Sequence, residues 1–180
     1  EHPRILRVLA PSTGPAPRGI AIDIGTTTIV VQLVDLESGR VLASEGGLNP
    51  QTSHGDDIIT RIIKAGEGNG LETLSRAVLG RINGLIDGLL ASTRTDHRDI
   101  VAAVVAGNST MIHLFLRIPP ESIRREPFVT TTNFPPFLRA EEAGFSILPD
   151  APVFFAPGMS WFVGGDITAG ILSCGLKKHE

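Results

Sequence analysis

The first third of the chain contains three short segments in which apolar and polar residues alternate, the pattern of β-strands that bury one face. In residues 19–24 the isoleucines share one face and Asp23 lies on the other. Two further segments follow at 29–35 and 41–45, and residues 37–39, Glu-Ser-Gly, join them as a typical hairpin turn. The pattern predicts three antiparallel strands at the start of the fold.

The next two segments have apolar residues three and four positions apart, which is the spacing of amphipathic helices. Residues 56–65 form the shorter helix, and glycines within 66–70 end it. Residues 71–91 carry the clearest helical pattern, so we expect this helix to pack on a face of the sheet. The apolar sides are formed by Ile58, Ile59, Ile62 and Ile63 in the first helix and by Leu71, Leu74, Val78, Ile82, Leu85 and Leu89 in the second.

The second half of the chain alternates strands with helices. A continuous apolar run at 100–106 predicts a central strand covered on both faces. A short helix at 110–117 follows, and it begins at the carboxyl edge of the sheet, where ligands bind in open α/β folds. Six prolines exclude long regular elements in 118–150, so we expect this segment to pack over one edge of the sheet. A strand at 152–156 and a helix from about 167 to 176 complete the pattern.

This order of elements predicts an α/β fold with a mixed sheet, in which three antiparallel strands come first and helices flank the faces. It is the order of a ribonuclease-H-like half-domain. Prolines and a glycine predict a linker at 1–18, followed by one lobe at 19–176 and a tail at 177–180. Because the chain opens on a linker, we expect it to come from a longer protein.

The turn after the first strand carries the strongest candidate chemistry, formed by Asp23, Gly25 and the hydroxyls of Thr26, Thr27 and Thr28. Gly25 allows a tight turn, and the amides and hydroxyls after it can donate to phosphate oxygens. A carboxylate beside phosphate needs a cation between the two, so Asp23 indicates Mg2+, bound directly or through water. The alternative is an ordinary hairpin turn. The P-loop and dinucleotide-binding patterns are both excluded, because a strand follows the turn.

Two later turns could complete this site. Asn108 and Ser109 stand between the central strand and its helix, where capping that helix is the simpler role. Gly164, Gly165 and Asp166 precede the last helix. Asp166 either caps that helix or lies across the cleft, where it could orient a water or a metal ion for attack on a terminal phosphate. The sequence leaves these alternatives open.

Composition narrows the function classes. A chain of 180 residues with 42% hydrophobic residues and a net charge of -3 fits a soluble α/β protein without the basic footprint of a nucleic-acid binder. No apolar run is long enough for a bilayer and no signal-peptide pattern is present, so we expect no membrane association and a cytoplasmic protein. Cys174 is the only cysteine, which excludes an internal disulfide, and we expect Cys174 and His113 to be buried.

Five motifs carry a resemblance to a known family. They are Ile-Asp-Ile-Gly-Thr-Thr-Thr at 22–28, Leu-Asn-Pro-Gln at 48–51, Gly-Asp-Asp-Ile-Ile-Thr-Arg-Ile at 55–62, Ala-Gly-Asn-Ser-Thr-Met at 106–111 and Phe-Val-Gly-Gly-Asp-Ile-Thr-Ala-Gly at 162–170. In this order they resemble the C-terminal ATPase domain of reductive activators of corrinoid proteins, within the actin, Hsp70 and sugar-kinase superfamily. The resemblance implies an actin-like ATPase lobe that binds ATP and Mg2+.

The resemblance also implies roles for single residues. Asp23 would organise Mg2+, Gly25 and the three threonines would hold phosphates, and Asn108 and Asp166 would line the far side of the site. Asp23 and Asp166 are therefore the candidate catalytic residues. The candidates for cofactor binding are Gly25, Thr26, Thr27, Thr28, Asn108, Ser109, Gly164 and Gly165.

The family implies a reaction as well. Its members hold an iron-sulfur cluster, 2Fe-2S, in an upstream ferredoxin-like domain, and ATP helps to drive the electron transfer that returns an inactive Co(II) corrinoid to Co(I). The partner would be a corrinoid protein or a corrinoid methyltransferase. The resemblance also suggests a homodimer.

The chain lacks two parts of the family pattern, a second phosphate-binding loop and an adenosine-binding region, which belong to a second lobe. We therefore expect one lobe that by itself binds nucleotide weakly and turns it over negligibly. Two other functions stay open. One is a docking module that uses the nucleotide only as a switch, and the other is a lobe of a small-molecule kinase.

Overall fold

The computed structural model describes residues 16–175, so the predicted tail at 177–180 and residues 1–15 of the predicted linker lie outside the described part. A six-stranded mixed sheet runs in the order β3-β2-β1-β4-β6-β5. The strands are β1 (Arg18–Ile24), β2 (Thr28–Asp35), β3 (Val41–Leu48), β4 (Ile100–Gly107), β5 (Leu138–Arg139) and β6 (Pro152–Phe155). The helices are α1 (Ile58–Ala65), α2 (Gly70–Thr93), α3 (Ser109–Phe115), α4 (Ala140–Ala143) and α5 (Gly165–Ser173), with 3-10 helices at Pro50–His54, His97–Asp99 and Glu121–Arg124.

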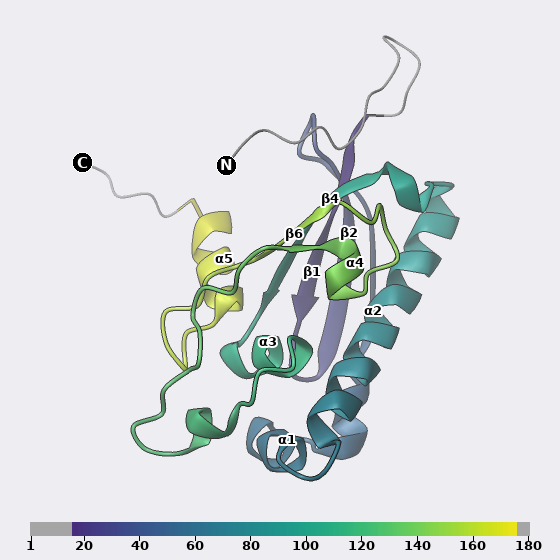
Figure 1. Cartoon of the computed structure of the whole chain (residues 1–180). Coiled ribbons are helices and arrows are strands. Elements are labelled where there is room, and N and C mark those ends of the chain that lie inside the picture. The colour runs from purple at the N-terminus through teal and green to yellow at the C-terminus, as the bar shows by residue number, and fades with distance from the viewer. Residues whose placement is uncertain (1–15, 176–180) are drawn as a thin grey trace, which may run out of the picture.

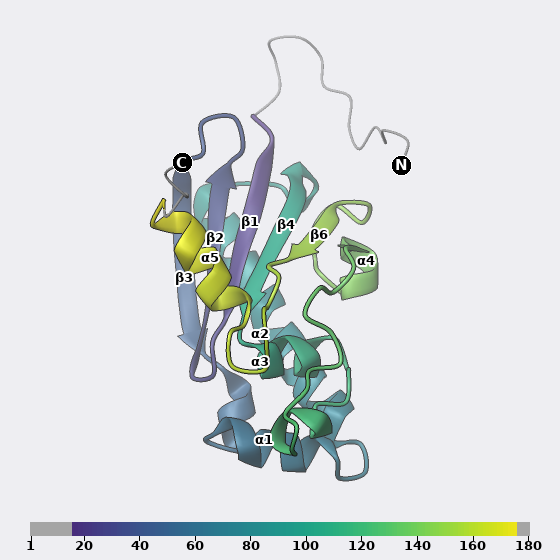
Figure 2. The same ribbon diagram turned by 90° about the vertical axis from the view of Figure 1, so that its left-hand side faces the viewer.

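The helices form layers on the two faces and at one end of the sheet. The long helix α2 lies along one face, and α5 stands over the opposite face, in front of β1 and β2 in Figure 2. The helices α1 and α3 lie beyond the carboxyl ends of β1 and β4 (Figure 1). The predicted α/β class, a mixed sheet flanked by helices, is confirmed.

Strand β1 is the centre of the sheet. It pairs antiparallel with β2 and parallel with β4, while β3 and β6 extend the two sides. The alternation buries Ile20, Ile22 and Ile24 in the core and leaves Asp23 exposed on the opposite face. The three antiparallel strands at the start are confirmed. The first of them begins at Arg18, within the predicted linker.

The core lies between this sheet and α2. Five of the apolar residues predicted for the long helix are buried, namely Leu74, Val78, Ile82, Leu85 and Leu89. Burying each such side chain contributes about 1.5–3 kcal/mol relative to leaving it in water. The predicted packing of this helix on the sheet is confirmed.

The short helix α1 differs from its prediction. Only Ile62 of its four isoleucines is fully buried, whereas Ile59 and Ile63 are 51% and 44% exposed. Arg61 takes their place and is fully buried. Its guanidinium donates to the carbonyl of Gly55. The spacing of hydrophobic residues cannot predict such a contact, because the contact depends on where the guanidinium meets a hydrogen-bond acceptor in the folded chain.

Two further positions predicted to be buried are exposed. Val104 of β4 is 46% exposed, because α5 covers only part of the sheet face on which this residue lies. Cys174, at the C-terminal cap of α5, is also exposed, since α5 stands at the surface. The α5 side of the sheet is therefore more open than the α2 side.

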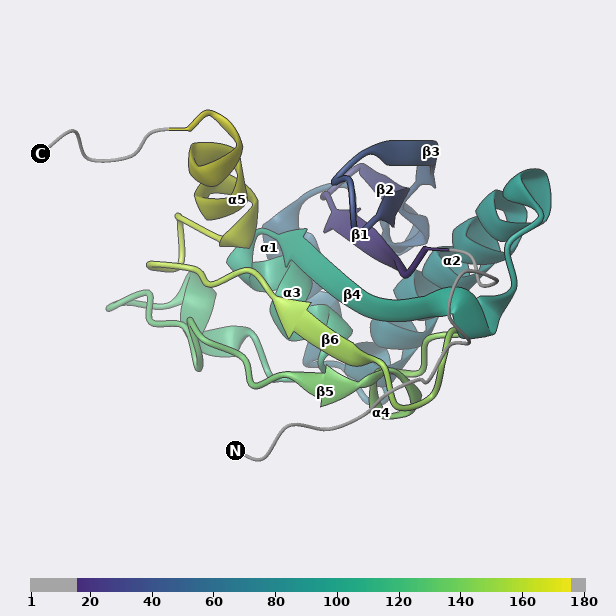
Figure 3. The ribbon, with the colours of Figure 1, turned by 90° about the horizontal axis from the view of Figure 1, so that it is seen from above.

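The proline-rich segment 118–150 contains only short regular elements and covers one edge of the sheet, as predicted, where its own strand β5 pairs with β6 (Figure 3). His113 of α3 anchors this segment and is 1% exposed. Its Nδ1 donates to the Ser109 carbonyl at 2.6 Å, and its Nε2 accepts from the Thr131 amide at 3.2 Å. The predicted core position of His113 is confirmed, and its two contacts require the neutral ring.

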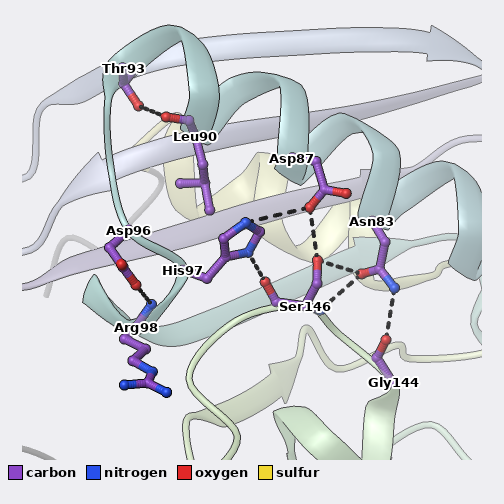
Figure 4. A network of polar contacts seen from close by, with 9 residues as sticks. All are labelled: Asn83, Asp87, Leu90, Thr93, Asp96, His97, Arg98, Gly144 and Ser146. Carbon is purple, nitrogen blue, oxygen red and sulfur yellow. Dashed lines mark hydrogen bonds and ion pairs between the residues drawn. The ribbon is translucent and has the colours of Figure 1, made fainter.

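A second polar network holds the far end of the same segment against α2 (Figure 4). Asn83 donates to the Gly144 carbonyl at 2.9 Å and accepts from the Ser146 amide at 3.1 Å. The Ser146 hydroxyl donates to Asp87 at 3.2 Å, and its carbonyl contacts Nδ1 of His97. Because the serine hydroxyl binds the carboxylate and not the imidazole, this cluster is a structural tether and not a catalytic triad.

We expect His113 to make the fold less stable as the pH falls. Burial lowers the pKa of its imidazole, and the hydrogen bond to Ser109 opposes this shift. In the unfolded chain a histidine titrates near pH 6.5, so below about this pH the unfolded state binds a proton that the folded state does not. Stability is therefore kept above about pH 6.5 and lost as the pH falls toward the folded-state pKa.

The measurement is the melting temperature between about pH 7.5 and about pH 5.5, which should fall less for His113→Gln than for the wild type. His54→Gln, at a histidine outside this contact, should follow the wild type. The same pH dependence in His113→Gln and the wild type would contradict the expectation.

Candidate functional site

The turn between β1 and β2 is a tight hairpin closed by its own backbone. The Gly25 amide donates to the Thr28 carbonyl at 3.0 Å. A Cβ on Gly25 would lie 2.6 Å from that carbonyl oxygen, so only glycine fits at this position. Thr27 and Thr28 are exposed and Thr26 is half-buried. The turn thus presents backbone and hydroxyl groups at the end of the strand that carries Asp23.

Asn49 holds this turn from the inside. It is fully buried, and its backbone amide donates to the Thr27 carbonyl at 2.8 Å. Its side-chain amide donates to the Gly25 carbonyl at 2.8 Å, and its Oδ1 accepts from the Gln51 amide at 3.0 Å. Asn49 belongs to one of the family motifs, but the sequence gives no role for it. The only local sign of its importance is that it is a polar residue placed before a proline.

The turn between β4 and α3 reaches the first turn. The Asn108 side chain accepts from the Met111 amide at 2.9 Å, which caps α3, and donates to the Thr26 hydroxyl at 3.1 Å. Capping is therefore not the only role of Asn108. Ser109 is buried, and its hydroxyl donates to the Ser160 carbonyl at 2.8 Å, which ties this turn to the loop before α5.

That loop packs directly on the β4–α3 turn. A Cβ on Gly164 would lie 2.5 Å from the Cα of Asn108 and 2.7 Å from the Ser109 nitrogen. A Cβ on Gly165 would lie 2.4 Å from the carbonyl oxygen of Ala156. Both glycines are needed for this close approach of one backbone to another.

The start of α5 brings a second carboxylate to the first. Gly164 is the N-terminal cap of α5 and Asp166 lies within its first turn, so the interpretation of Asp166 as the cap is wrong. Although Asp23 is exposed on its sheet face, partial burial of its carboxylate raises its pKa, and the nearby carboxylate of Asp166 raises it further. Two like charges held close together favour a cation between them.

A groove of about 330 Å3 lies between α5 and the open sheet face beside these carboxylates. Its lining includes Asp23, Gln32, Val104, Ala106 and Ala169. Within residues 16–175, no group of three or more His, Cys, Asp or Glu side chains could hold a metal ion. Mg2+ commonly takes only one or two protein carboxylates and completes its shell with water and phosphate oxygens, which the pair of aspartates fits.

No helix in the described part is long and apolar enough to cross a membrane.

Replacing Asp23 with Asn should stabilise the ligand-free chain. The folded-state pKa of Asp23 is raised, so its charge destabilises the fold above that pKa and has no effect below the unfolded value of about 3.9. We expect the melting temperature of Asp23→Asn to exceed that of the wild type by about 1–3 °C at about pH 7, and the difference to shrink as the pH falls toward about 4.

Asp35 provides a control of opposite sign. Its carboxylate accepts from the amides of Ser38 and Glu37, both at 2.9 Å, and these bonds lower its pKa. Asp35→Asn should therefore lower the melting temperature at neutral pH. If Asp23→Asn also lowered the melting temperature, the charge of Asp23 would not be destabilising the fold.

Gly164→Ala should destabilise the lobe by about 1–3 kcal/mol, because the added methyl group overlaps backbone atoms that cannot rotate away. Gly170 of α5 is the matched control, since a Cβ there meets nothing within 4 Å. Gly170→Ala should stabilise the chain by up to about 1 kcal/mol through helix propensity. Chemical denaturation measures both, and equal stability of Gly164→Ala and the wild type would contradict the packing.

Comparison with known proteins places this chain in a family. Residues 18–179 match the family model described as the RACo middle region. Corrinoid activation enzyme RamQ of Eubacterium limosum is 37% identical over 163 residues, which cover 90% of this chain and 27% of RamQ. A solved structure described as a reductive activator for corrinoid, iron-sulfur protein is 49% identical, with a TM-score of 0.88 over 92% of this chain and 26% of that chain.

This chain therefore spans about a quarter of the length of these two relatives. The resemblance to reductive activators of corrinoid proteins is confirmed, and so is the fold that it implies. The chain belongs to the RACo middle-region family.

Proposed function

We propose that this chain is the ATP-binding lobe of a reductive activator that returns a Co(II) corrinoid protein to Co(I). The observation that carries the proposal is the meeting of three segments, far apart in the sequence, around the β1–β2 turn and Asp23. The hydrogen bond from Asn108 to Thr26 joins two of them, and the effect of Asp166 on the pKa of Asp23 joins the third. RamQ and the solved activator are named for corrinoid activation, which supplies the reaction.

The groups around this turn suit ATP with Mg2+. Asp23 and Asp166 would hold the metal, directly or through water, and the amides and hydroxyls of residues 25–28 would donate to phosphate oxygens. Gly164 keeps the start of α5 against the β4–α3 turn, and so keeps Asp166 near Asp23. When bound, ATP supplies the free energy of binding and hydrolysis that an unfavourable electron transfer requires.

The remaining parts of the proposed reaction belong to the whole protein. A 2Fe-2S cluster in an upstream domain would donate one electron, and the Co(II) of a corrinoid protein or a corrinoid methyltransferase would accept it. A second lobe would supply the opposing phosphate-binding loop and the contacts to adenosine. The whole protein would act in the cytoplasm as a homodimer.

NMR titration of this chain with Mg2+ and ATP tests the binding site. We expect amide shifts at residues 25–28 and at Asp166, with a dissociation constant near about 1 mM, because one lobe supplies only half of the contacts. Asp23→Ala should remove the effect of Mg2+, whereas Asp35→Ala, at the far end of β2, should not. Robust ATP hydrolysis by this chain, abolished in Asp23→Ala, would contradict the assignment of a half-site.

The reaction is tested with the full-length protein and a Co(II) corrinoid protein, by the absorbance of Co(I). Reduction should require ATP and should be lost in Asp23→Ala. Reduction that persists with a non-hydrolysable ATP analogue would favour a nucleotide-switched docking module. Phosphate transfer to a sugar or an acid would favour a small-molecule kinase.

A further inference from the structure

Arg61 of α1 is a buried cation whose hydrogen bonds are incomplete within the described residues. Its side chain is fully buried, and it forms no ion pair within residues 16–175. Nε donates to the Gly55 carbonyl at 2.8 Å, and Nη1 lies 3.4 Å from the sulfur of Met111. Nη2 has no hydrogen-bond partner in the described part of the chain. This arrangement leaves the guanidinium without a direct ion pair in the described part of the chain, so only the more distant carboxylates of Asp56 and Asp57 offset its charge.

Packing alone does not account for an arginine at this position. Arginine stays protonated in proteins, and a buried charge without a partner is strongly unfavourable. Burial lowers the pKa of Arg61, and Asp56 and Asp57 at the start of α1 oppose this shift. The Asp57 carboxylate, however, is bonded to the Thr60 amide at 2.8 Å. An apolar residue of similar volume is often at least as stable in such a place.

A short series of contacts leads from Arg61 to the β1–β2 turn. Nη1 lies 3.4 Å from the Met111 sulfur, and that sulfur lies 3.9 Å from Nδ2 of Asn49. The same Nδ2 lies 2.8 Å from the Gly25 carbonyl oxygen. The side chains of Arg61, Met111 and Asn49 are all buried. Because no solvent separates the guanidinium from the turn, its field is weakly screened there.

We propose that Arg61 raises the affinity of the β1–β2 turn for polyphosphate anions through its field, without touching them. This inference rests on the proposed function, since it assumes that the turn binds phosphate. It accounts for the unpartnered Nη2 in the described part of the chain, because a carboxylate bonded directly to Arg61 would cancel more of the field at the turn. Arg61 is therefore a supporting residue and not a catalytic one.

The test compares two variants of this chain. Arg61→Met removes the charge and keeps a long apolar stem, whereas Arg61→Lys keeps the charge and loses the guanidinium contacts. NMR titrations use inorganic tripolyphosphate and inorganic phosphate, each with Mg2+, as probes of high and low charge. Melting temperatures are measured on the same samples.

We expect Arg61→Met to weaken tripolyphosphate binding by about tenfold or more, because each unit of ligand charge about 10 Å from the guanidinium accounts for about tenfold at an effective dielectric constant of about 20. Phosphate, with fewer charges, should lose less, and Arg61→Lys should stay within about twofold of the wild type. The melting temperature of Arg61→Met should be no lower than that of the wild type. A purely structural role would instead lower stability and affect both probes equally.

Several results would overturn the proposal. Equal tripolyphosphate binding by Arg61→Met and the wild type would refute it and leave the phosphate site standing. Equal losses in Arg61→Met and Arg61→Lys would point to geometry and not to charge. If Arg61→Met and Arg61→Gln both fail to fold, the role is structural. If the wild type binds neither tripolyphosphate nor ATP, the proposed function itself fails.

Discussion

The parallel pairing of β1 with β4 is the contact on which the site depends. In this register Asp23 lies beside Ala106, so both strands end at the same edge of the sheet. The turns that follow them emerge side by side, which is why the side chain of Asn108 reaches Thr26 at 3.1 Å. A slip of one residue in β1 would turn Asp23 into the apolar core, and the site would lose its carboxylate.

Backbone contact, more than side-chain packing, places the third part of the site. Gly164 lies so close to Asn108 that no side chain could stand between the two segments. The bond from Ser109 to the Ser160 carbonyl fixes the loop that leads into α5. These contacts hold Asp166 near Asp23 although the two carboxylates repel, and such stored unfavourable interactions are typical of binding and catalytic sites.

Most of the fold could be predicted, because its core follows simple periodicities. The isoleucines of β1 and the leucine spacing of α2 both report which side is buried. In α1 the same reasoning is wrong, because Arg61 is placed by what its guanidinium contacts and not by its hydrophobicity.

The candidate site was visible in the sequence only in part. Asp23 and Gly25 can be identified from the local sequence, as an acid and a glycine at the end of a strand. The support from Asn49 and the approach of Asp166 depend on contacts between residues far apart in the chain, which no local pattern encodes.

Charges of both signs surround the β1–β2 turn, and their placement suits one kind of ligand. The carboxylates of Asp23 and Asp166 share the α5 face, while the guanidinium of Arg61 lies in the interior behind the turn. Both the carboxylate pair and the guanidinium are unfavourable in the free chain, and a bound group of opposite charge would relieve each of them. A cation alone would leave Arg61 uncompensated, and an anion alone would be repelled by the carboxylates. A metal–polyphosphate complex would satisfy both, so under the proposed function its binding would stabilise the fold through the same groups that otherwise weaken it.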